Sequence, residues 1–509
     1  MGKSKALNLC LTILLSLAAA NAPAFAAKTI YVDRDAAGAN NGSSWPDAYK
    51  FLQDALTDAD SSAKPAEIRV AQGTYRPDED SLHPDGTGSR EATFQLIDGV
   101  TLKGGYAGFG ERDPNAWDVE LYKTILSGDL NGDDVNVGNP ADLRYEPTRA
   151  ENSYHVTNGS GTDPTAVMNG FTITGAYTGG YGGGMLIREG GSPTLINCIF
   201  AGNWAQEGGG GIGNYMGSPV LFKCTLSGNS AEDTGGGMLT SGEGQSNLTL
   251  INCTFSDNFV QGQGGGMYNE ATRLTLTNCR FTRNSAAYGG AMDNVPLISG
   301  TLTNCTFIGN SATQSGGVMR SILSNVLLTN CTFTGNSAPN GNALACDWPI
   351  PGYPSNIEMT NCVLWDGGNE VVNTDNSEIE ITYSDLQDGW LGQDNIAVDP
   401  CFADPCNGDY HLKSQAGRWD ANEGRWAIDD VTSPCIDAGD PMSPIGPEPF
   451  PNGGIINMGA YGGTGEASKS YFGEPSCETI VAGDINGDCQ INFKDFFFIA
   501  LHWLTANTP

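Results

Sequence analysis

The sequence is poor in positively charged residues. Its 509 residues include 25 lysines and arginines against 58 aspartates and glutamates, which gives a formal net charge of −33 at pH 7. A chain this acidic is repelled by nucleic-acid phosphates and by anionic lipid surfaces, so we expect neither as a partner. The charge is compatible with calcium binding, and an acidic, solvated surface on an exported protein explains it equally well.

Common catalytic signatures are also absent. The sequence contains no nucleotide-binding loop and no HExxH motif, and His155 and His411 are too isolated to predict a catalytic triad or a zinc site. Two adjacent aspartate pairs, 133–134 and 429–430, fall in expected loops. They are weak evidence for the aspartate cluster of an inverting glycoside hydrolase.

Long apolar runs are scarce. The apolar run at residues 7–20 follows Lys3 and Lys5 and precedes a small-x-small site at Ala24-Phe25-Ala26, which predicts a signal peptide over residues 1–26. No other stretch is long and apolar enough to span a membrane. We therefore expect an exported protein, extracellular or at the cell surface or outer membrane, without a membrane span after cleavage.

The sequence does contain abundant glycine, 69 residues, and a repeat. Seven cysteines are separated by 26, 29, 26, 26, 26 and 31 residues, and an asparagine follows each of the first six by five positions. A period in the twenties is typical of a solenoid, in which one supersecondary unit stacks on the next. The cysteines are Cys198, Cys224, Cys253, Cys279, Cys305, Cys331 and Cys362.

Alternation within the repeat indicates strands. Leu274 and Leu276 alternate with threonines, the phase slips by one residue at Asn278, and Cys279 and Phe281 form the next apolar pair. A slip predicts a bend, and asparagine tolerates the left-handed conformation that a tight bend requires. With a glycine pair and a third strand at Met292, each unit is one coil of a parallel β-helix. A helical period of 3.6 residues is absent.

Stacked coils would place equivalent residues in columns about 4.8 Å apart. We expect Leu, Cys, Phe and Met inside, asparagines at the bends, and a right-handed coil. Neighbouring cysteines would lie within bridging distance, but a column of inward thiols also packs well as small apolar residues, and we expect it unbridged. The Asn-Cys-Thr triplets at Asn252, Asn304 and Asn330 would be structural bends and not glycosylation sites.

The repeated pattern N-C-x-F-x-x-N-x-A followed by G-G-G-M resembles the polymorphic outer membrane protein repeat. More broadly, residues 165–370 resemble right-handed parallel β-helix, or pectin-lyase-like, proteins of bacterial surfaces. The resemblance implies an all-β fold, and it is specific for fold but weak for activity.

The remaining segments are expected to close this solenoid. Residues 44–56 predict an amphipathic N-terminal cap helix, since an open solenoid end exposes core and strand edges. A closing segment with Cys401, Cys406 and Cys435 as plausible disulfide partners resembles that of exported β-helix proteins of planctomycete-type bacteria. The predicted divisions are signal peptide 1–26, cap and irregular coils 27–160, regular coils 161–395, closing segment 396–464, linker 465–479 and tail 480–509.

The tail carries the spacing of an EF-hand-type calcium loop. Side-chain oxygens fall at loop positions 1, 3, 5, 7, 9 and 12, and the segment resembles half of a dockerin, a calcium-dependent module that binds cohesin receptors. A dockerin has two such loops, and this chain has one. The expected ligands are Asp484, Asn486, Asp488, Gln490, Asn492 and Asp495, the seventh-position Gln490 usually binding through its backbone carbonyl.

A second possible calcium loop lies between the irregular and the regular coils. Asp129, Asn131 and Asp133 place three oxygens at alternate positions. A carboxylate at the twelfth position is missing, so a plain acidic loop remains the alternative.

An outward column of the coils is the candidate glycan site. Alignment on the methionines puts Tyr268, Asp293 and Arg320 on successive rungs, with Glu270 and Tyr215 near. The tyrosines would stack on a sugar. Polysaccharide lyases of this fold use calcium-binding carboxylates and a basic residue, so the resemblance implies catalytic roles for Asp293, Glu270 and Arg320. The alternative is a salt bridge between rungs on a solvated face.

Two functions therefore remain open: a non-catalytic glycan-binding or adhesive protein, or a polysaccharide lyase or glycoside hydrolase acting on an acidic polysaccharide. Fold alone does not decide between them. Convergence of Asp293, Glu270 and Arg320 in a deep groove would favour the enzyme, and a flat face would favour the binder.

Overall fold

The computed structural model of the chain describes residues 28–348, 350, 352–472, 493 and 496. The predicted signal peptide lies outside these residues. Within the described residues, no helix is both long enough and apolar enough to cross a membrane.

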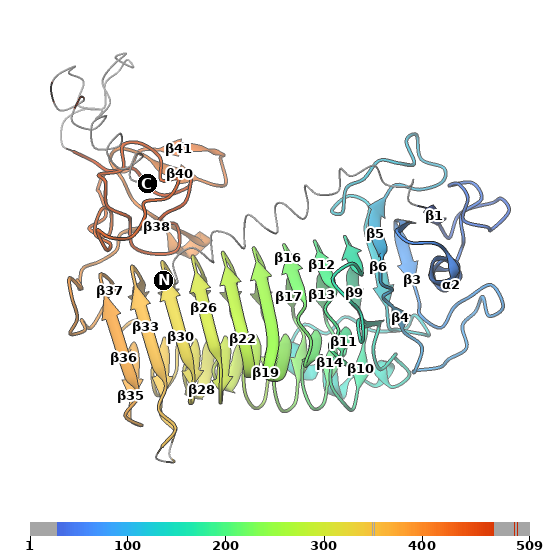
Figure 1. The fold of residues 1–509 in the computed structure, drawn as a ribbon, viewed down its shortest axis with the longest axis horizontal. Coiled ribbons are helices and arrows are strands. Elements are labelled where there is room, and N and C mark those ends of the chain that lie inside the picture. Colours follow the sequence, from blue (N-terminus) through green and yellow to red (C-terminus); the bar gives the residue numbers. More distant parts are fainter. Residues whose placement is uncertain (1–27, 349, 351, 473–492, 494–495, 497–509) are drawn as a thin grey trace.

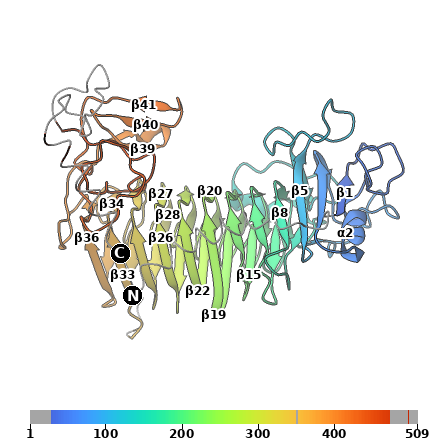
Figure 2. The same ribbon diagram turned by 45° about the horizontal axis from the view of Figure 1, so that its top comes forward.

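The described chain forms a parallel β-solenoid whose coils stack along the long axis (Figures 1 and 2). One side is an eleven-stranded parallel sheet with one short strand per coil. Its strands are β3 (Gly73–Tyr75), β6 (Thr124–Ser127), β9 (Thr172–Thr174), β13 (Ile199–Ala201), β17 (Thr225–Ser227), β20 (Thr254–Ser256), β23 (Arg280–Thr282), β27 (Thr306–Ile308), β31 (Thr332–Thr334), β34 (Val363–Trp365) and β37 (Asp385–Leu386).

A six-stranded sheet follows the eleven-stranded sheet in the six coils that contain β9, β13, β17, β20, β23 and β27. Its strands are β10 (Tyr177–Thr178), β14 (Trp204–Ala205), β18 (Ser230–Ala231), β21 (Phe259–Val260), β24 (Ser285–Tyr288) and β28 (Ser311–Ser315). Together with the strand after each glycine bend, this confirms several short strands and bends per repeat.

The broad sheet has twenty strands in two columns, which β19 and β22 join by running through both. Its strands are β1 (Lys28–Val32), β2 (Ala66–Ala71), β4 (Phe94–Gln95), β5 (Val100–Tyr106), β7 (Thr157–Asn158), β8 (Val167–Asn169), β11 (Met185–Ile187), β12 (Thr194–Ile196), β15 (Ile212–Tyr215), β16 (Val220–Phe222), β19 (Met238–Ile251), β22 (Met267–Thr277), β25 (Met292–Val295), β26 (Ser299–Thr303), β29 (Met319–Ser321), β30 (Asn325–Thr329), β32 (Leu344–Cys346), β33 (Asn356–Thr360), β35 (Val371–Asn373) and β36 (Glu378–Thr382).

The bend predicted from the phase slip is confirmed. Asn278 has a φ of 54°, and the asparagine before each neighbouring cysteine is also left-handed, for example Asn252 at 55° and Asn304 at 54°. This reversal lets the residues on both sides of Asn278 point inward, because it shifts the alternation by one residue.

The expected core columns are confirmed as well. Leu276, Cys279, Phe281 and Met292 are all buried. The phenylalanine rings stack from coil to coil, with centroids 5.2 Å apart between Phe281 and Phe307. The seven repeat cysteines are buried and unbridged.

The asparagine that follows each of the first six cysteines is buried within the coil, not placed at an exposed turn. From Asn229 on, each side-chain Oδ1 accepts hydrogen bonds from the backbone N–H and the Nδ2 of the asparagine one coil earlier, as Asn284 does from Asn258 at 3.2 and 2.9 Å, whereas Asn203 accepts from the Ala176 N–H. Each Nδ2 also donates to a backbone carbonyl, as Asn284 does to Phe255. A buried amide needs such partners. We call Asn203, Asn229, Asn258, Asn284, Asn310 and Asn336 the asparagine column.

The N-terminal cap helix exists, but its predicted start is wrong. Helix α2 is Leu52–Ser61 and buries Leu52, Ala55, Leu56 and Ala59 against the first coils. Residues 44–47 form a turn instead, in which Ser44 Oγ accepts from the Asp47 N–H at 3.3 Å. The serine and proline that suggested a helix start thus serve this turn, and Tyr49 forms a strand bridge with Val32.

The closing segment folds back over the eleven-stranded sheet and carries two antiparallel pairs (Figure 2). Asn304 Nδ2 donates to the carbonyls of Ala460 and Gly462, both at 2.8 Å, so this sequon asparagine is a structural group. The expected disulfides are not formed, since Cys401, Cys406 and Cys435 are free. The pairs are β38 (Phe402–Asp404) with β39 (Asp409–Leu412), and β40 (Arg418–Asp420) with β41 (Arg425–Ala427).

Candidate functional site

The column of the broad sheet that contains β22, β25 and β29 has the predicted register. Tyr268 on β22 pairs with Asp293 on β25, which pairs with Arg320 on β29. These three side chains therefore occupy successive coils, as the methionine alignment indicated.

The expectation that Asp293 and Arg320 form an open patch is wrong. Asp293 is 0% exposed and Arg320 is 3% exposed. Arg320 Nε and Nη2 donate to the two carboxylate oxygens of Asp293 at 2.8 and 2.7 Å. Two aromatic rings lie over the Arg320 guanidinium, those of Tyr288 and Trp348, with centroids 4.1 and 6.0 Å from it.

This pairing bears on the predicted catalysis. Burial lowers the pKa of Arg320, but the facing Asp293 carboxylate more than offsets it, so the pKa lies above its ordinary value. Burial raises the pKa of Asp293 despite Arg320. A guanidinium held in its cationic form cannot remove a proton, and the geometry favours the salt bridge between rungs. The catalytic role stays a prediction.

Glu270 does not join this pair. It is exposed on β22, two residues beyond Tyr268, and its carboxylate accepts a hydrogen bond from Ser241 on β19 at 3.0 Å. The three residues expected to converge are thus divided between a buried pair and an exposed carboxylate.

The tyrosines form a larger group than predicted. Tyr215 packs edge to face on Tyr181, with ring centroids 4.7 Å apart, and Arg188 lies 5.5 Å from the Tyr215 ring. Burial raises the pKa of Tyr215 and of Tyr268, which keeps both phenols neutral. We call Tyr181, Tyr215, Tyr268 and Tyr288 the tyrosine face.

Tyr181 and Tyr288 were missed from the sequence. Each directly precedes a run of two or three glycines and belongs to a bridged column that runs through Gly208, Thr234 and Gln263. The position before the glycines was therefore the signal that would have found them.

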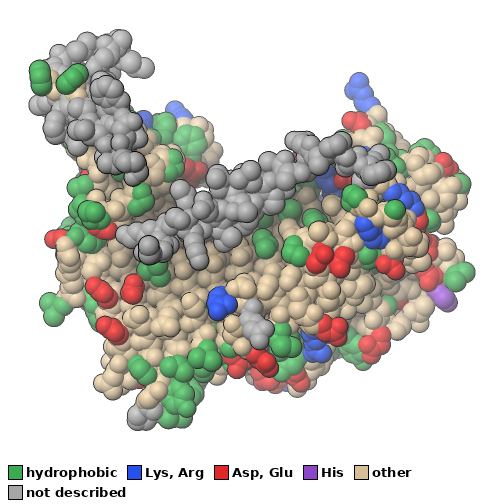
Figure 3. Space-filling view, viewed as in Figure 1, with side chains coloured by type: hydrophobic (Ala, Val, Ile, Leu, Met, Phe, Trp, Pro, Cys, Tyr) green, Lys and Arg blue, Asp and Glu red, His purple; other side chains and the backbone are tan. Residues whose placement is uncertain are grey.

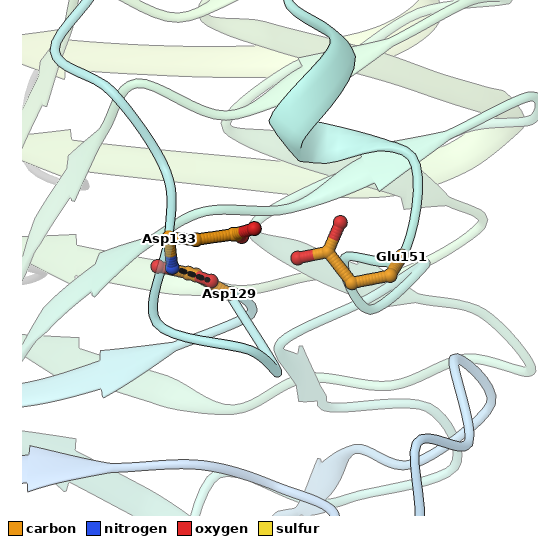
Figure 4. Close-up of side chains that lie close together, drawn as sticks. All are labelled: Asp129, Asp133 and Glu151. Atoms are coloured by element: carbon orange, nitrogen blue, oxygen red, sulfur yellow. Dashed lines mark hydrogen bonds between the residues drawn. The ribbon is translucent and has the colours of Figure 1, made fainter.

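The acidic loop gains a carboxylate that the sequence did not predict. Single carboxylate oxygens of Asp129, Asp133 and Glu151 lie within 4.8 Å of one another (Figure 4). Asn131 is exposed. Glu151 comes from the far end of a polar insertion, residues 128–153, and its Oε1 is buried without a hydrogen-bond partner. Burial raises the pKa of Glu151, and the neighbouring aspartates raise it further.

Part of the loop geometry is structural. Asp129 Oδ1 accepts from the N–H groups of Gly132 and Asp133 at 2.6 and 3.2 Å, and its Oδ2 accepts from the Asp134 N–H at 3.2 Å. Such turns hold the insertion in shape.

A cavity of about 740 Å³ lies beside this cluster, between the insertion and the turns of the regular coils. Asp134 and Arg149 line it, and Arg149 donates to the Gly202 carbonyl at 2.8 Å from η3 (Pro147–Arg149). Burial raises the pKa of Asp134, and Arg149 partly opposes this.

The predicted calcium loop of the tail lies outside the described residues. Asp484, Asn486, Asp488, Gln490, Asn492 and Asp495 therefore stay predicted ligands.

The acidic surface itself has no single focus on the face seen in Figure 3, where acidic side chains are spread among fewer basic ones. This distribution fits the solvated surface considered above.

Comparison with known proteins bears on the fold. A model described as the right handed beta helix region matches residues 152–297. The coil is right-handed. A second model, described as disaggregatase related, matches residues 310–439. No match was found among curated proteins.

Among solved structures, a rhamnogalacturonan lyase is similar at 12% sequence identity and a TM-score of 0.34. The match covers 80% of this chain and 96% of that chain. Polymorphic repeats and a dockerin module remain predictions.

Proposed function

We propose that this exported β-helix protein binds a glycan on the tyrosine face. The observation that carries the proposal is the placement of four partly exposed tyrosines on four of five consecutive coils, with Arg188 beside Tyr215. Tyrosine offers an apolar ring and a polar hydroxyl at little cost in conformational entropy, which suits stacking on sugar rings.

Non-catalytic binding is the better reading of this face. Asp293 and Arg320 satisfy each other and are shielded from solvent, so neither is free to transfer a proton to a substrate. The protein would act outside the cell or at its surface, with the tail attached to a cohesin-like receptor.

Calcium supports this function in two places. In the insertion, the oxygens of Asp129, Asp133 and Glu151 are close enough to share one ion, and the unpartnered Oε1 of Glu151 supplies the carboxylate missing from the loop. In the tail, the EF-hand-like spacing suits a second ion.

A polysaccharide-cleaving enzyme is the second candidate, and one observation favours it. The cavity beside the insertion holds Asp134, whose burial raises its pKa, which suits a general acid. Incubation with acidic and neutral polysaccharides, followed by ultraviolet absorbance and by reducing ends, tests for cleavage. Products that vanish in Asp134→Asn would move the function to this cavity.

Binding is tested by measuring the affinity of the mature protein for a glycan panel. We expect Tyr215→Ala and Tyr268→Ala to weaken binding of the best ligand about tenfold each, about 1.4 kcal/mol. Tyr145→Ala is the matched control, because Tyr145 is an exposed tyrosine on η2 (Pro140–Tyr145) of the insertion. The tyrosine face would be rejected as the binding site if Tyr145→Ala weakened glycan binding as much as the other two variants. It would also be rejected if none of the three variants weakened binding.

A further inference from the structure

The asparagine column ends in a carboxyl group. Asp366 follows Cys362 by four residues instead of five, and its Oδ1 accepts from the N–H and the Nδ2 of Asn336 at 2.8 and 2.9 Å. Asn336 receives the same two bonds from Asn310, at 2.8 and 3.0 Å. Asp366 therefore takes the place of the next asparagine.

The next acceptor is also a carboxyl group. Glu370 Oε1 accepts from the N–H groups of Asp366 and Gly368, both at 3.0 Å, which is the bond that an asparagine of a further coil would receive. Glu370 is 3% exposed. The Asp366 carboxyl thus occupies the place of an asparagine, and the Glu370 carboxyl occupies the place of the acceptor in the coil that would follow.

An aspartate in the place of an asparagine lacks the Nδ2–H group that donates to the next acceptor of the column. The Nδ2 of every asparagine in the column donates to the next acceptor, whereas an ionised Asp366 has no hydrogen to donate. Asp366 Oδ2 and Glu370 Oε2 are buried without a partner, although the two carboxyls lie within hydrogen-bonding reach. Two buried carboxylates at this distance repel each other unless a proton or a cation lies between them.

The surroundings supply no counter-charge. Of the described residues, no lysine, arginine or histidine forms an ion pair with Asp366 or Glu370. The next coil contributes Gln387, which accepts from Gly367 N–H at 2.7 Å, and the exposed Asp388, which accepts from Asn369 N–H at 2.6 Å.

A metal ion fits poorly here. The Oδ1 of Asp366 and the Oε1 of Glu370 are each occupied by two N–H donors, which leaves two free carboxylate oxygens. Calcium takes six to eight oxygen ligands.

We infer that Asp366 is an un-ionised carboxylic acid in the folded protein at neutral pH, and that its Oδ2–H donates to Glu370. The proton replaces the amide hydrogen of asparagine and completes the last step of the column. It secures the turn 366–370, whose Asn369 and Glu370 carbonyls accept from the N–H groups of Asn342, Ala343 and Leu344.

Burial raises the pKa of Asp366 well above its ordinary value, and the charge of Glu370 raises it further, against the bonds from Asn336. An acid whose folded pKa is raised contributes stability that is fully present below its unfolded pKa and is lost as pH rises towards the folded value. Alkaline conditions should therefore loosen this end of the solenoid.

The test compares thermal unfolding of the full mature chain with that of Asp366→Asn from pH 5 to pH 9. Asparagine supplies the hydrogen at every pH, so we expect the melting temperature of the variant to fall less with rising pH and to exceed that of the wild type by a few degrees at pH 9. Asp388→Asn, which removes a charge from an exposed neighbour, should keep the wild-type slope. An Asp366→Asn protein that keeps the wild-type slope would overturn the inference.

Infrared spectroscopy reads the proton directly. At pH 8 the difference spectrum between wild type and Asp366→Asn should contain the carbonyl stretch of an un-ionised carboxylic acid. Absence of this band would overturn the inference. So would a chelator that lowers the melting temperature of the wild type but not that of Asp366→Asn, because a cation would then neutralise the pair.

Discussion

The regular coils and the acidic insertion treat polar side chains in opposite ways. In the coils, buried polar groups recur with the repeat and meet partners one coil away, as in the asparagine column and the Asp293–Arg320 pair. In the insertion, Asp129, Asp133 and Glu151 come together without a repeat, and Glu151 Oε1 has no partner. Partnered groups are committed to structure, whereas the unpartnered Oε1 of Glu151 remains available to a ligand.

The strongest test of this comparison breaks the buried ion pair. Arg320→Ala should lower the free energy of unfolding by about 3–5 kcal/mol, because it leaves Asp293 buried and unpaired. Urea unfolding measures the loss. The exposed pair of Arg283 with Asp257 is the matched control, since Arg283→Ala should cost less than about 1 kcal/mol.

A double variant sharpens the result. Asp293→Leu combined with Arg320→Met replaces the pair with apolar groups and should recover most of the stability lost in Arg320→Ala. If Arg320→Ala costs no more than the control, the pair is open to water, and the catalytic interpretation of the face regains support.

An interruption of the asparagine column should have a somewhat smaller effect. Asn284→Leu removes the acceptor of two donors from Asn258, one on the backbone and one on the side chain. Leaving them buried without a partner should cost about 2–3 kcal/mol in urea unfolding. Asn325→Leu, at an exposed position at the start of β30, should be nearly neutral, and equal costs would contradict a structural role for the column.

The smallest expected effect concerns the insertion. With Asp484→Ala and Asp488→Ala present to remove the tail loop, calcium should raise the melting temperature through the site at Asp129, Asp133 and Glu151, because an ion that binds only the folded state stabilises it. Glu151→Gln should abolish the rise, and the exposed Glu243→Gln should not. A rise that persists in Glu151→Gln would place calcium elsewhere.

The coils could be predicted because every inference from one repeat is tested by the next. The phase slip at Asn278 recurs at Asn252 and Asn304, and the left-handed φ confirms the bend at all three. The burial of the Asp293–Arg320 pair could not be predicted in this way, since the rings over Arg320 come from Tyr288 and Trp348, and other coils have Thr234 or Gln263 in the place of Tyr288.

The carboxylate cluster of Asp129, Asp133 and Glu151 illustrates the same limit. Eighteen residues separate Glu151 from Asp133, and the path between them includes two short 3-10 helices that carry no periodic signal. Spacing rules recognise ligands that share one loop, and they miss a ligand that the fold returns from a distance.

The stacked columns also allow the length of the solenoid to change by whole coils. Residues 279–304 span one whole coil, so their removal would carry Asn278 directly into Cys305 and bring Asn258 opposite Asn310 without a break in register. The length of the protein can therefore change in whole coils, by duplication or loss of a 26-residue segment. The outer side chains do not share this freedom, because the same deletion would remove Asp293 and leave Arg320 without its partner.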